Sequence, residues 1–251
     1  TIETRNCQEE ARKFYKEAGL DFSKHAVCVT AEGSKLYNTA QDENWIEFFP
    51  MCDFVGGRTS VMSPVGLLPL SLVGIDVDGL LHGAADCDEL SRTKEFLCNP
   101  GAIMAMNWYY CSGGVGGTTQ IVLPYKDNLF LLANYLQQLV MESLGKEYDL
   151  DGNKVNQGLA VLGNKGSTDQ HSYVQQLVSG PDNVFVTFVS VLKDRLSESS
   201  TVGEDSTSGD YLNAFMLGTR AALASHGKKS MSITVREASA YNIGQIIALF
   251  E

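Results

Sequence analysis

The sequence predicts an α/β protein in which a mostly parallel sheet is covered by helices on both faces. Short apolar segments rich in β-branched residues, which is the pattern of buried strands, alternate along the chain with longer segments of helical periodicity. That alternation is typical of β-α-β connections, whose strands run parallel and whose helices lie on both faces of the sheet. The glycine-rich segment CSGGVGGTTQ at 111–120 interrupts the alternation, so we expect a domain boundary there.

The individual elements follow from hydrophobic spacing and from the glycines and prolines that end or begin helices. We expect helices at 2–18, within 56–74, and at 76–91, 100–111, 127–145, 167–179, 210–226 and from Asn242 onward. We expect strands at 25–30, 45–50, 120–125, 158–164, 183–192 and 229–237, and a polar exposed loop at 197–209. Gly19 ends the first helix, and Pro64 lies in the first turn of the second.

Composition narrows the classes of function. The chain has 251 residues, of which 44% are hydrophobic, and this suits one or two globular domains with a sizeable core. A net charge of -11 argues against a basic nucleic-acid-binding surface but does not exclude an anionic substrate. No apolar segment approaches the roughly 20 residues that span a membrane. Because the sequence starts at Thr1 and stops within an apolar helix, we expect an internal fragment, with any targeting segment outside it.

Six cysteines occur without any C-x-x-C pair. We therefore expect reduced, mostly buried thiols in an intracellular compartment, and neither disulfides nor a metal site.

The segment VGGRTS at 55–60 places an arginine directly after two glycines at the start of a helix. Glycines permit positive φ angles or the close approach of another group to the backbone, and the arginine can point its guanidinium into a cleft. The alternative, which the local pattern alone favours, is a tight turn with a solvent-facing Arg58.

One stripe of the helix expected at 127–145 begins apolar and turns polar toward its end. Its members are Leu131, Tyr135, Gln138 and Glu142. A carboxylate at that end would be partly removed from water, a setting that suits a general base. The alternative, which the stripe alone favours, is an ordinary i,i+4 ion pair between Glu142 and Lys146 on a solvated face.

The segment GNKGSTDQH at 163–171 combines two glycines, a lysine and a histidine at the start of a predicted helix. Ser167 and Gln170 have the spacing of a capping box, and Asp169 lies in the first turn. His171 would lie near the positive end of the helix dipole, which favours a neutral imidazole that can accept a proton. A capped helix with an incidental histidine is the alternative, but it leaves the glycines and the lysine unexplained.

These three segments, in this order, resemble the signatures of the glucose-6-phosphate isomerase family. DFVGGRTSVMSPVGL resembles its G-G-R signature, LQQLVMESLGK its Q-x-x-x-E-S segment and GNKGSTDQHSYVQQL its Q-H segment. NKGSTDQH is similar to the cyanobacterial and plastid branch, and so is TIETRN, which would place Thr1 at the last residue of a phosphate-binding loop. The resemblance covers essentially the whole chain.

The resemblance implies a three-layer α-β-α sandwich of the sugar-isomerase (SIS) type with two SIS domains. The first, at 1–111, would be incomplete, 112–120 would be a linker, and 121–251 would be a second SIS domain truncated at its C-terminal end. The implied protein is a homodimer of glycolysis and gluconeogenesis, in the cytoplasm or the plastid stroma. It would interconvert glucose 6-phosphate and fructose 6-phosphate through an enediolate without cofactor or metal, and would bind neither nucleic acid nor membrane.

The resemblance also implies roles for particular residues. Glu142 matches the base that moves a proton between C1 and C2, and Arg58 matches the arginine that stabilises the intermediate. His171 matches the residue that helps to open the sugar ring, and in the family it serves the partner subunit's site. The positions that match substrate contacts are Gln138, Gly57 and Thr1, the last of these a phosphate contact. The residue types suit the chemistry, because a carboxylate can carry a proton between adjacent carbons and a guanidinium can offset charge on oxygen.

Alternatives to an isomerase stay open at this point. The family's Ser-Lys stretch before Thr1 and its late glutamine and lysine lie outside the sequence, so we expect the isolated chain to be inactive. A non-catalytic, sugar-phosphate-binding SIS module of the regulatory kind would keep the fold but would not need Glu142. The chain would otherwise be the isomerase half of a fused enzyme, or purely structural. The joint presence of Glu142, Arg58 and His171 favours the isomerase over the regulatory module.

Overall fold

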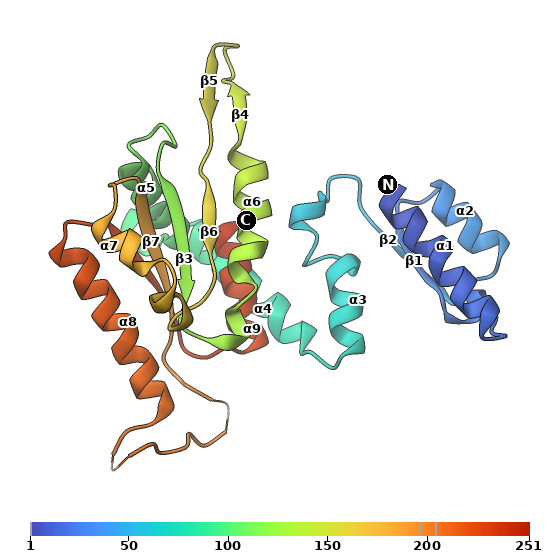
Figure 1. Cartoon of the computed structure of the whole chain (residues 1–251). Coiled ribbons are helices and arrows are strands. Elements are labelled where there is room, and N and C mark those ends of the chain that lie inside the picture. The colour runs from blue at the N-terminus through green and yellow to red at the C-terminus, as the bar shows by residue number, and fades with distance from the viewer. Residues whose placement is uncertain (1, 196, 204) are drawn as a thin grey trace. The chain divides into compact units, whose positions relative to one another are not determined.

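Parallel strands alternate with helices along most of the chain, as the hydrophobic pattern predicts (Figure 1). The structure, a computed structural model, describes residues 2–195, 197–203 and 205–251. These divide into two units, Thr1–Ile75 and Asp76–Glu251. Within the described ranges, no helix is both long and apolar enough to cross a membrane.

The first unit contains two short parallel strands and three helices. In chain order its elements are α1 (Ile2–Glu17), β1 (Val27–Thr30), α2 (Lys35–Asp42), β2 (Glu47–Pro50) and α3 (Pro64–Leu72). Helix α2 is absent from the sequence prediction, and Ser34 caps it by accepting a hydrogen bond from the backbone N–H of Tyr37 at 3.1 Å. Pro64 is the first residue of α3, which confirms its predicted position at a helix start.

The Arg12 side chain ties α1 to the loops of the first unit. Its guanidinium lies 4.6 Å from the ring centroid of Phe22 and donates to a carboxylate oxygen of Glu43 at 2.6 Å. Trp45 Nε1 donates to the same oxygen at 2.8 Å. These two hydrogen bonds, chiefly the one from Arg12, hold the pKa of Glu43 below its ordinary value.

The second unit is built on a four-stranded sheet whose strands all run parallel. The strand order is β6-β3-β7-β8. The strands are β3 (Thr119–Pro124), β6 (Val161–Gly163), β7 (Val184–Val191) and β8 (Ser230–Val235). The helices are α4 (Val77–Ser91), α5 (Pro100–Ser112), α6 (Leu132–Leu144), α7 (Val174–Ser179), α8 (Ser208–Ser225) and α9 (Ala240–Phe250).

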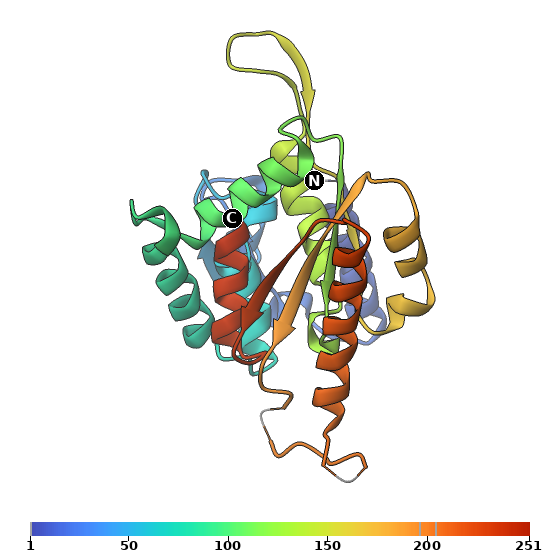
Figure 2. The same cartoon turned by 90° about the vertical axis from the view of Figure 1, so that its left-hand side faces the viewer.

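Helices lie on both faces of this sheet, so the second unit is a three-layer sandwich (Figures 1 and 2). On one face, Val122 and Val189 pack against residues of α5, α6 and α9. On the other face, Leu123 and Phe188 pack against α7 and α8. Successive residues of a strand point to opposite faces, so a strand covered on both sides is apolar at most positions. The buried polar residues Gln120 and Thr187 are hydrogen-bonded to each other. This explains why the sequences of β3 and β7 are largely apolar.

Helices α4 and α9 approach each other closely because glycines lie at their contact. A Cβ atom at Gly83 would lie 1.9 Å from the carbonyl oxygen of Tyr241, and one at Gly244 would lie 2.0 Å from the carbonyl oxygen of Leu80. Each glycine therefore leaves room for the backbone of the opposite helix.

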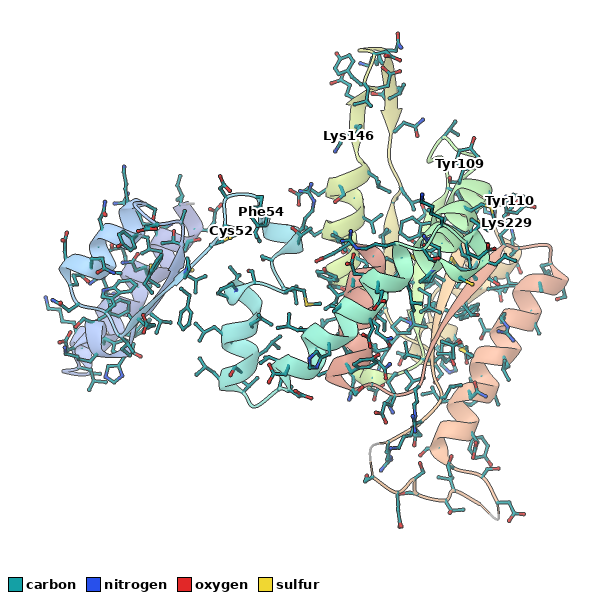
Figure 3. The ribbon with its side chains drawn as sticks, turned by 180° about the vertical axis from the view of Figure 1, so that it is seen from behind. Cys52, Phe54, Tyr109, Tyr110, Lys146 and Lys229 are labelled. Atoms are coloured by element: carbon teal, nitrogen blue, oxygen red, sulfur yellow. The ribbon has the colours of Figure 1, made fainter. Side chains whose placement is uncertain are left out.

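An antiparallel hairpin follows α6 and extends away from the sheet (Figure 1). Its strands are β4 (Lys146–Tyr148) and β5 (Lys154–Gln157), and Lys146 lies at its base (Figure 3). Asp149 holds the turn by accepting hydrogen bonds from the backbone N–H groups of Asp151 and Asn153 at 2.9 and 2.8 Å. The hairpin is absent from the sequence prediction, because its strands are largely polar and show no clear apolar alternation.

The expected linker at 112–120 is partly packed structure. A Cβ atom at Gly116 would lie 1.7 Å from the carbonyl oxygen of Gly158, and β3 already begins at Thr119. At the nearby end of α5, Lys229 lies beside the Tyr110 ring, 5.2 Å from its centroid (Figure 3). Helices α4 and α5 belong to the same compact unit as the second sheet. The division into SIS domains at 112–120 stays a prediction.

The six cysteines are free thiols, and the expectation that most of them are buried is wrong, because three of the six are exposed. Cys28, Cys87 and Cys111 are buried, and burial raises the pKa of each. Cys7, Cys52 and Cys98 are exposed, and Figure 3 shows Cys52 near Phe54 in the segment that follows β2.

Candidate active site

Helix α6 carries the predicted base and its glutamine neighbour on its exposed face. Leu136 and Leu139 point into the core, and this leaves Gln138 and Glu142 exposed, one turn apart. Gln138 Nε2 donates to Glu142 Oε2 at 3.2 Å. The structure therefore brings together two of the predicted site residues, with the amide beside the carboxylate.

The partly desolvated setting expected for Glu142 is not formed by the described residues, because its side chain is exposed. The last buried residue of α6 is Val140, and the final turn of the helix, which contains Glu142, extends beyond the hydrophobic core. Lys146 Nζ, the partner in the simpler alternative, donates to the carbonyl oxygen of Ser143 at 2.8 Å. Tyr135, on the same predicted stripe, is half-buried, and burial raises the pKa of its hydroxyl.

The helix predicted at 167–179 forms only in part, as α7 at its C-terminal end. A 3-10 turn at Thr168–His171 is separated from α7 by Ser172, whose backbone (φ -125°, ψ -78°) is not helical. The expected capping box is also absent, since the side chain of Ser167 caps no N–H group. His171 therefore does not lie at the start of a long helix, and the predicted dipole effect on its imidazole loses its basis.

The two glycines of GNKGSTDQH, unexplained by local pattern, are required by close packing. A Cβ atom at Gly163 would lie 2.1 Å from the carbonyl oxygen of Val122, and Gly163 has a φ of +149°. A Cβ atom at Gly166 would lie 2.3 Å from the ring carbon Cζ of Tyr125. The segment thus lies directly on β3 and on the aromatic ring that follows it.

Polar contacts also hold the GNKGSTDQH segment in place. Lys165 Nζ lies 2.5 Å from Asp127 Oδ1. Asp169 is buried, and the hydroxyl of Tyr173 donates to its Oδ2 at 2.5 Å. Burial, together with this contact to a carboxylate, raises the pKa of Tyr173. His171 itself is exposed, so a fixed loop presents its side chain to the surroundings.

The predicted arginine lies in the first unit, on the 3-10 turn Gly57–Thr59. Ser60 is buried, and its Oγ donates to the carbonyl oxygen of Gly57 at 2.7 Å, which fixes the turn. Neither glycine of the G-G-R signature has a positive φ, and no described atom lies within 4 Å of a Cβ built on Gly57. The Arg58 side chain is half-buried. Thr1, the predicted phosphate contact, lies outside the described residues.

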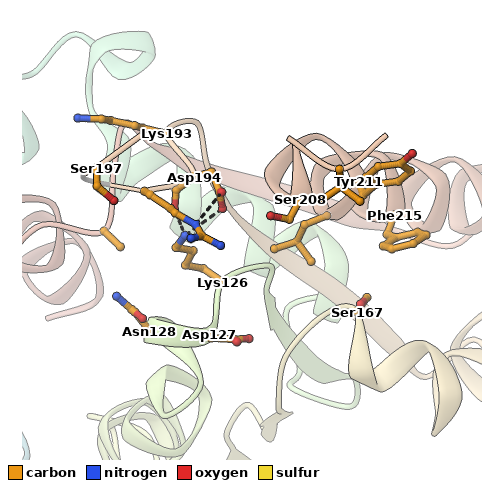
Figure 4. A pocket seen from close by; sticks show the side chains of 14 residues that line it. Lys126, Asp127, Asn128, Ser167, Lys193, Asp194, Ser197, Ser208, Tyr211 and Phe215 are labelled. Atoms are coloured by element: carbon orange, nitrogen blue, oxygen red, sulfur yellow. Dashed lines mark hydrogen bonds and ion pairs between the residues drawn. The ribbon is translucent and has the colours of Figure 1, made fainter. Parts of the chain in front are cut away.

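A cleft of about 930 Å³ opens beyond the carboxyl ends of β3 and β7 (Figure 4). The chain leaves β3 toward β6 and leaves β7 toward β8, so the cleft lies at the switch point where such sheets bind ligands. Lys126 crosses it, donating to the backbone carbonyl of Asp194 with its Nζ 3.3 Å from Oδ1 of the same residue. Of the described residues that line the cleft, Ser167 comes from the GNKGSTDQH segment, and no predicted catalytic residue is among them.

No group of three or more His, Cys, Asp or Glu side chains in the described part of the chain is placed to hold a metal ion. Further residues support the site but carry no signal in the sequence, namely Tyr125, Thr219 and the Lys165–Asp127 pair. Gln170 stands beside His171 in the sequence, and its partners could be recognised only in the folded chain.

The parallel three-layer sandwich, with its polar segments after the strands, is the architecture of SIS proteins. The chain belongs to the phosphoglucose isomerase family, whose model matches residues 1–223.

Relatives and solved structures agree with this assignment. The chain is 59% identical over 251 residues to glucose-6-phosphate isomerase of Desulfitobacterium hafniense (strain DSM 10664 / DCB-2), covering 100% of this chain and 47% of the relative. It is 55% identical over 252 residues to the chloroplastic glucose-6-phosphate isomerase 1 of Arabidopsis thaliana, covering 100% and 41%. A crystal structure of the Chlamydia trachomatis glucose-6-phosphate isomerase matches with a TM-score of 0.89 at 27% identity, covering 96% of this chain and 49% of that one. The chain thus spans about half the length of the curated relatives that it matches.

Proposed function

We propose that this chain carries the isomerase chemistry of its relatives, the interconversion of glucose 6-phosphate and fructose 6-phosphate. The observation that carries the proposal is family membership together with the presence of Glu142, Arg58 and His171 at the motif positions. The names of the relatives do not favour the alternative of a non-catalytic regulatory module.

In the proposed mechanism Glu142 moves a proton between C1 and C2 of the open-chain sugar. Gln138, whose amide donates to Glu142, orients the carboxylate and contacts the substrate. The exposed position of both side chains leaves them accessible to a ligand. Exclusion of water from the carboxylate would come from the bound substrate and from parts of the protein beyond this unit.

Arg58 is proposed to stabilise the negative charge that develops on the substrate oxygen during proton transfer. A guanidinium suits this role because it stays charged and presents several donors in a fixed plane. The open space above Gly57 supports the approach of a substrate to the backbone beside the arginine.

His171 is proposed to help open the sugar ring, as a proton shuttle that works near neutral pH. The same proposal makes the protein a homodimer in which His171 serves the partner subunit's site, and it gives Thr1 a phosphate contact. The proposal places the whole protein in the cytoplasm or the plastid stroma, and the Arabidopsis relative named chloroplastic supports the plastid alternative.

The test of this proposal is Glu142→Gln in the full-length protein. Exchange of the C2 proton of glucose 6-phosphate with solvent should be lost, while binding of the substrate stays near that of the parent. Glu147→Gln is the matched control, because it removes an exposed carboxylate nearby that pairs with Lys154 at 2.9 Å. Exchange at the parent rate in Glu142→Gln would show that this carboxylate is not the base.

A further inference from the structure

A hydrogen-bond cluster joins the His171 loop to helix α8. Gln170 Nε2 lies 2.7 Å from Thr219 Oγ1, 3.1 Å from the carbonyl oxygen of Phe215 and 3.3 Å from the hydroxyl of Tyr125. The hydroxyl of Tyr125 in turn donates to Thr219 Oγ1 at 3.1 Å. Three separate elements therefore meet at the residue directly before His171.

The donors and acceptors of this cluster can be assigned without conflict when the two amide hydrogens of Gln170 go to its two shorter contacts, Thr219 Oγ1 and the carbonyl oxygen of Phe215. Thr219 has one hydroxyl hydrogen, which goes to the carbonyl oxygen of Phe215 at 2.9 Å in the preceding helical turn. Its lone pairs are then available to accept from Gln170 Nε2 and from Tyr125. Thr219 and Tyr125 are buried, so these polar groups depend on each other for hydrogen bonds.

The cluster rests on elements that are themselves fixed. Helix α8 buries Met216, Thr219 and Leu223 along one stripe against the sheet. Tyr125 directly follows β3, and its ring packs against Phe188 on one side and leaves room only for a glycine at position 166. An amide tied to α8 and β3 therefore holds its neighbour in the chain at a defined place.

We infer that Thr219 and Tyr125 are positioning residues that set the orientation of His171 through Gln170. The inference rests on the proposed role of His171 in opening the sugar ring. None of the three residues needs to touch the substrate, and their effect is to keep the imidazole within reach of the ring oxygen. A misplacement of about 1 Å can reduce a catalysed rate about 100-fold.

The cluster should affect ring opening by His171 and not proton transfer by Glu142, so the two steps are measured separately. Full-length protein with Glu142→Gln should still open the ring while it no longer isomerises the sugar. In this background, ring opening is measured as enzyme-catalysed exchange between the α and β anomers of glucose 6-phosphate by NMR. A loss of folding would instead weaken substrate binding, which is measured in parallel.

Thr219→Val removes the hydroxyl and keeps the shape of the side chain. We expect it to slow anomer exchange between about 10-fold and 100-fold with little change in substrate binding. Thr219→Ser keeps the hydroxyl and should restore exchange to the rate of the Glu142→Gln parent. If Thr219→Val does not fold, Tyr125→Phe removes a single hydroxyl from the same cluster and should slow exchange in the same direction.

Thr187→Val is the matched control. Thr187 is fully buried in the same sheet, and its hydroxyl accepts a hydrogen bond from Gln120 Nε2 at 2.8 Å. The control loses a comparable buried contact, so it should lower stability while leaving anomer exchange at the parent rate. Equal slowing by Thr187→Val and Thr219→Val would overturn the inference, because the effect would then be one of general stability.

His171→Asn in the same background distinguishes the proposed role of His171 in ring opening from the positioning role of Thr219 and Tyr125. If it leaves anomer exchange unchanged, the proposed role of His171 fails, and the inference fails with it. If it slows exchange but Thr219→Val and Tyr125→Phe do not, the role of His171 stands and the positioning cluster is wrong.

Discussion

Substitution of Gly83 by alanine tests the close contact between α4 and α9. The new Cβ atom would lie 1.9 Å from the carbonyl oxygen of Tyr241, whereas ordinary carbon–oxygen contacts begin at about 3.3 Å. The helices would have to separate by roughly 1.4 Å. The atoms that the new Cβ would meet belong to the backbone of Tyr241, so no flexible side chain can move aside. Overpacking of this kind costs about 1–3 kcal/mol, and the size of the clash places it near the upper end.

Alanine also has an intrinsic advantage in a helix, which has to be subtracted from that cost. Relative to glycine it favours the helix by about 1 kcal/mol. The expected net loss for Gly83→Ala is therefore about 2 kcal/mol of unfolding free energy. For a unit of this size that corresponds to a fall of about 4–8 °C in Tm.

The matched control is Gly218→Ala in the middle of α8. Gly218 is exposed, and no described atom lies within 4 Å of a Cβ built there. The same chemical change should therefore raise the unfolding free energy by about 1 kcal/mol and Tm by about 2–4 °C. Thermal unfolding followed by circular dichroism compares both variants with the parent. The reasoning is refuted if the two variants shift Tm in the same direction.

Three further predictions concern the cap of α8, the His171 loop and the thiols. The backbone N–H and the hydroxyl of Thr207 hold the pKa of Asp210 below its ordinary value, so its stabilising contribution exists at neutral pH and is lost as the pH falls through that lowered value. Asp210→Asn should accordingly lower Tm at neutral pH, with a difference from the parent that disappears in acid; a constant difference would contradict this. Gly166→Ala should cost about 1–3 kcal/mol in urea unfolding, because the buried Tyr125 ring blocks its Cβ, and an unchanged midpoint would argue against that packing. Alkylation of the native 251-residue chain, followed by mass spectrometry, should be fast at the exposed thiols of Cys7, Cys52 and Cys98 and slow at the three buried thiols. Uniform labelling of all six would contradict the burial assignments.

Much of the fold could be predicted from the sequence because its elements have strong local patterns. Strands β3 and β7 are largely apolar segments covered on both faces, and the glycines and prolines that bound several helices act within a few residues. Helix α2 and the β4–β5 hairpin were missed because both are short and largely polar. Their stability comes from a serine cap and an aspartate-held turn, which are weak signals in a sequence.

The sequence predicted which residue types make up the candidate site, but it did not predict most of their contacts. The i,i+4 spacing of Gln138 and Glu142 on a helix correctly indicated that the two side chains meet. The capping box proposed for Ser167 was wrong because Gln170 instead bonds Thr219, 49 residues further along the chain. A capping box with suitable spacing does form at Thr207 and Asp210, where each side chain accepts a hydrogen bond from the other residue's backbone N–H.

The sequence alone determined the alternation of strands and helices and the chemical groups available for proton transfer. The tertiary structure decided that GNKGSTDQH is a fastened loop and not the start of a long helix. Its two glycines are needed because Val122 of β3 and Tyr125, which directly follows that strand, lie against its backbone. The physical reason is that local patterns specify backbone preferences worth about 1 kcal/mol each, and buried contacts between distant residues can outweigh them.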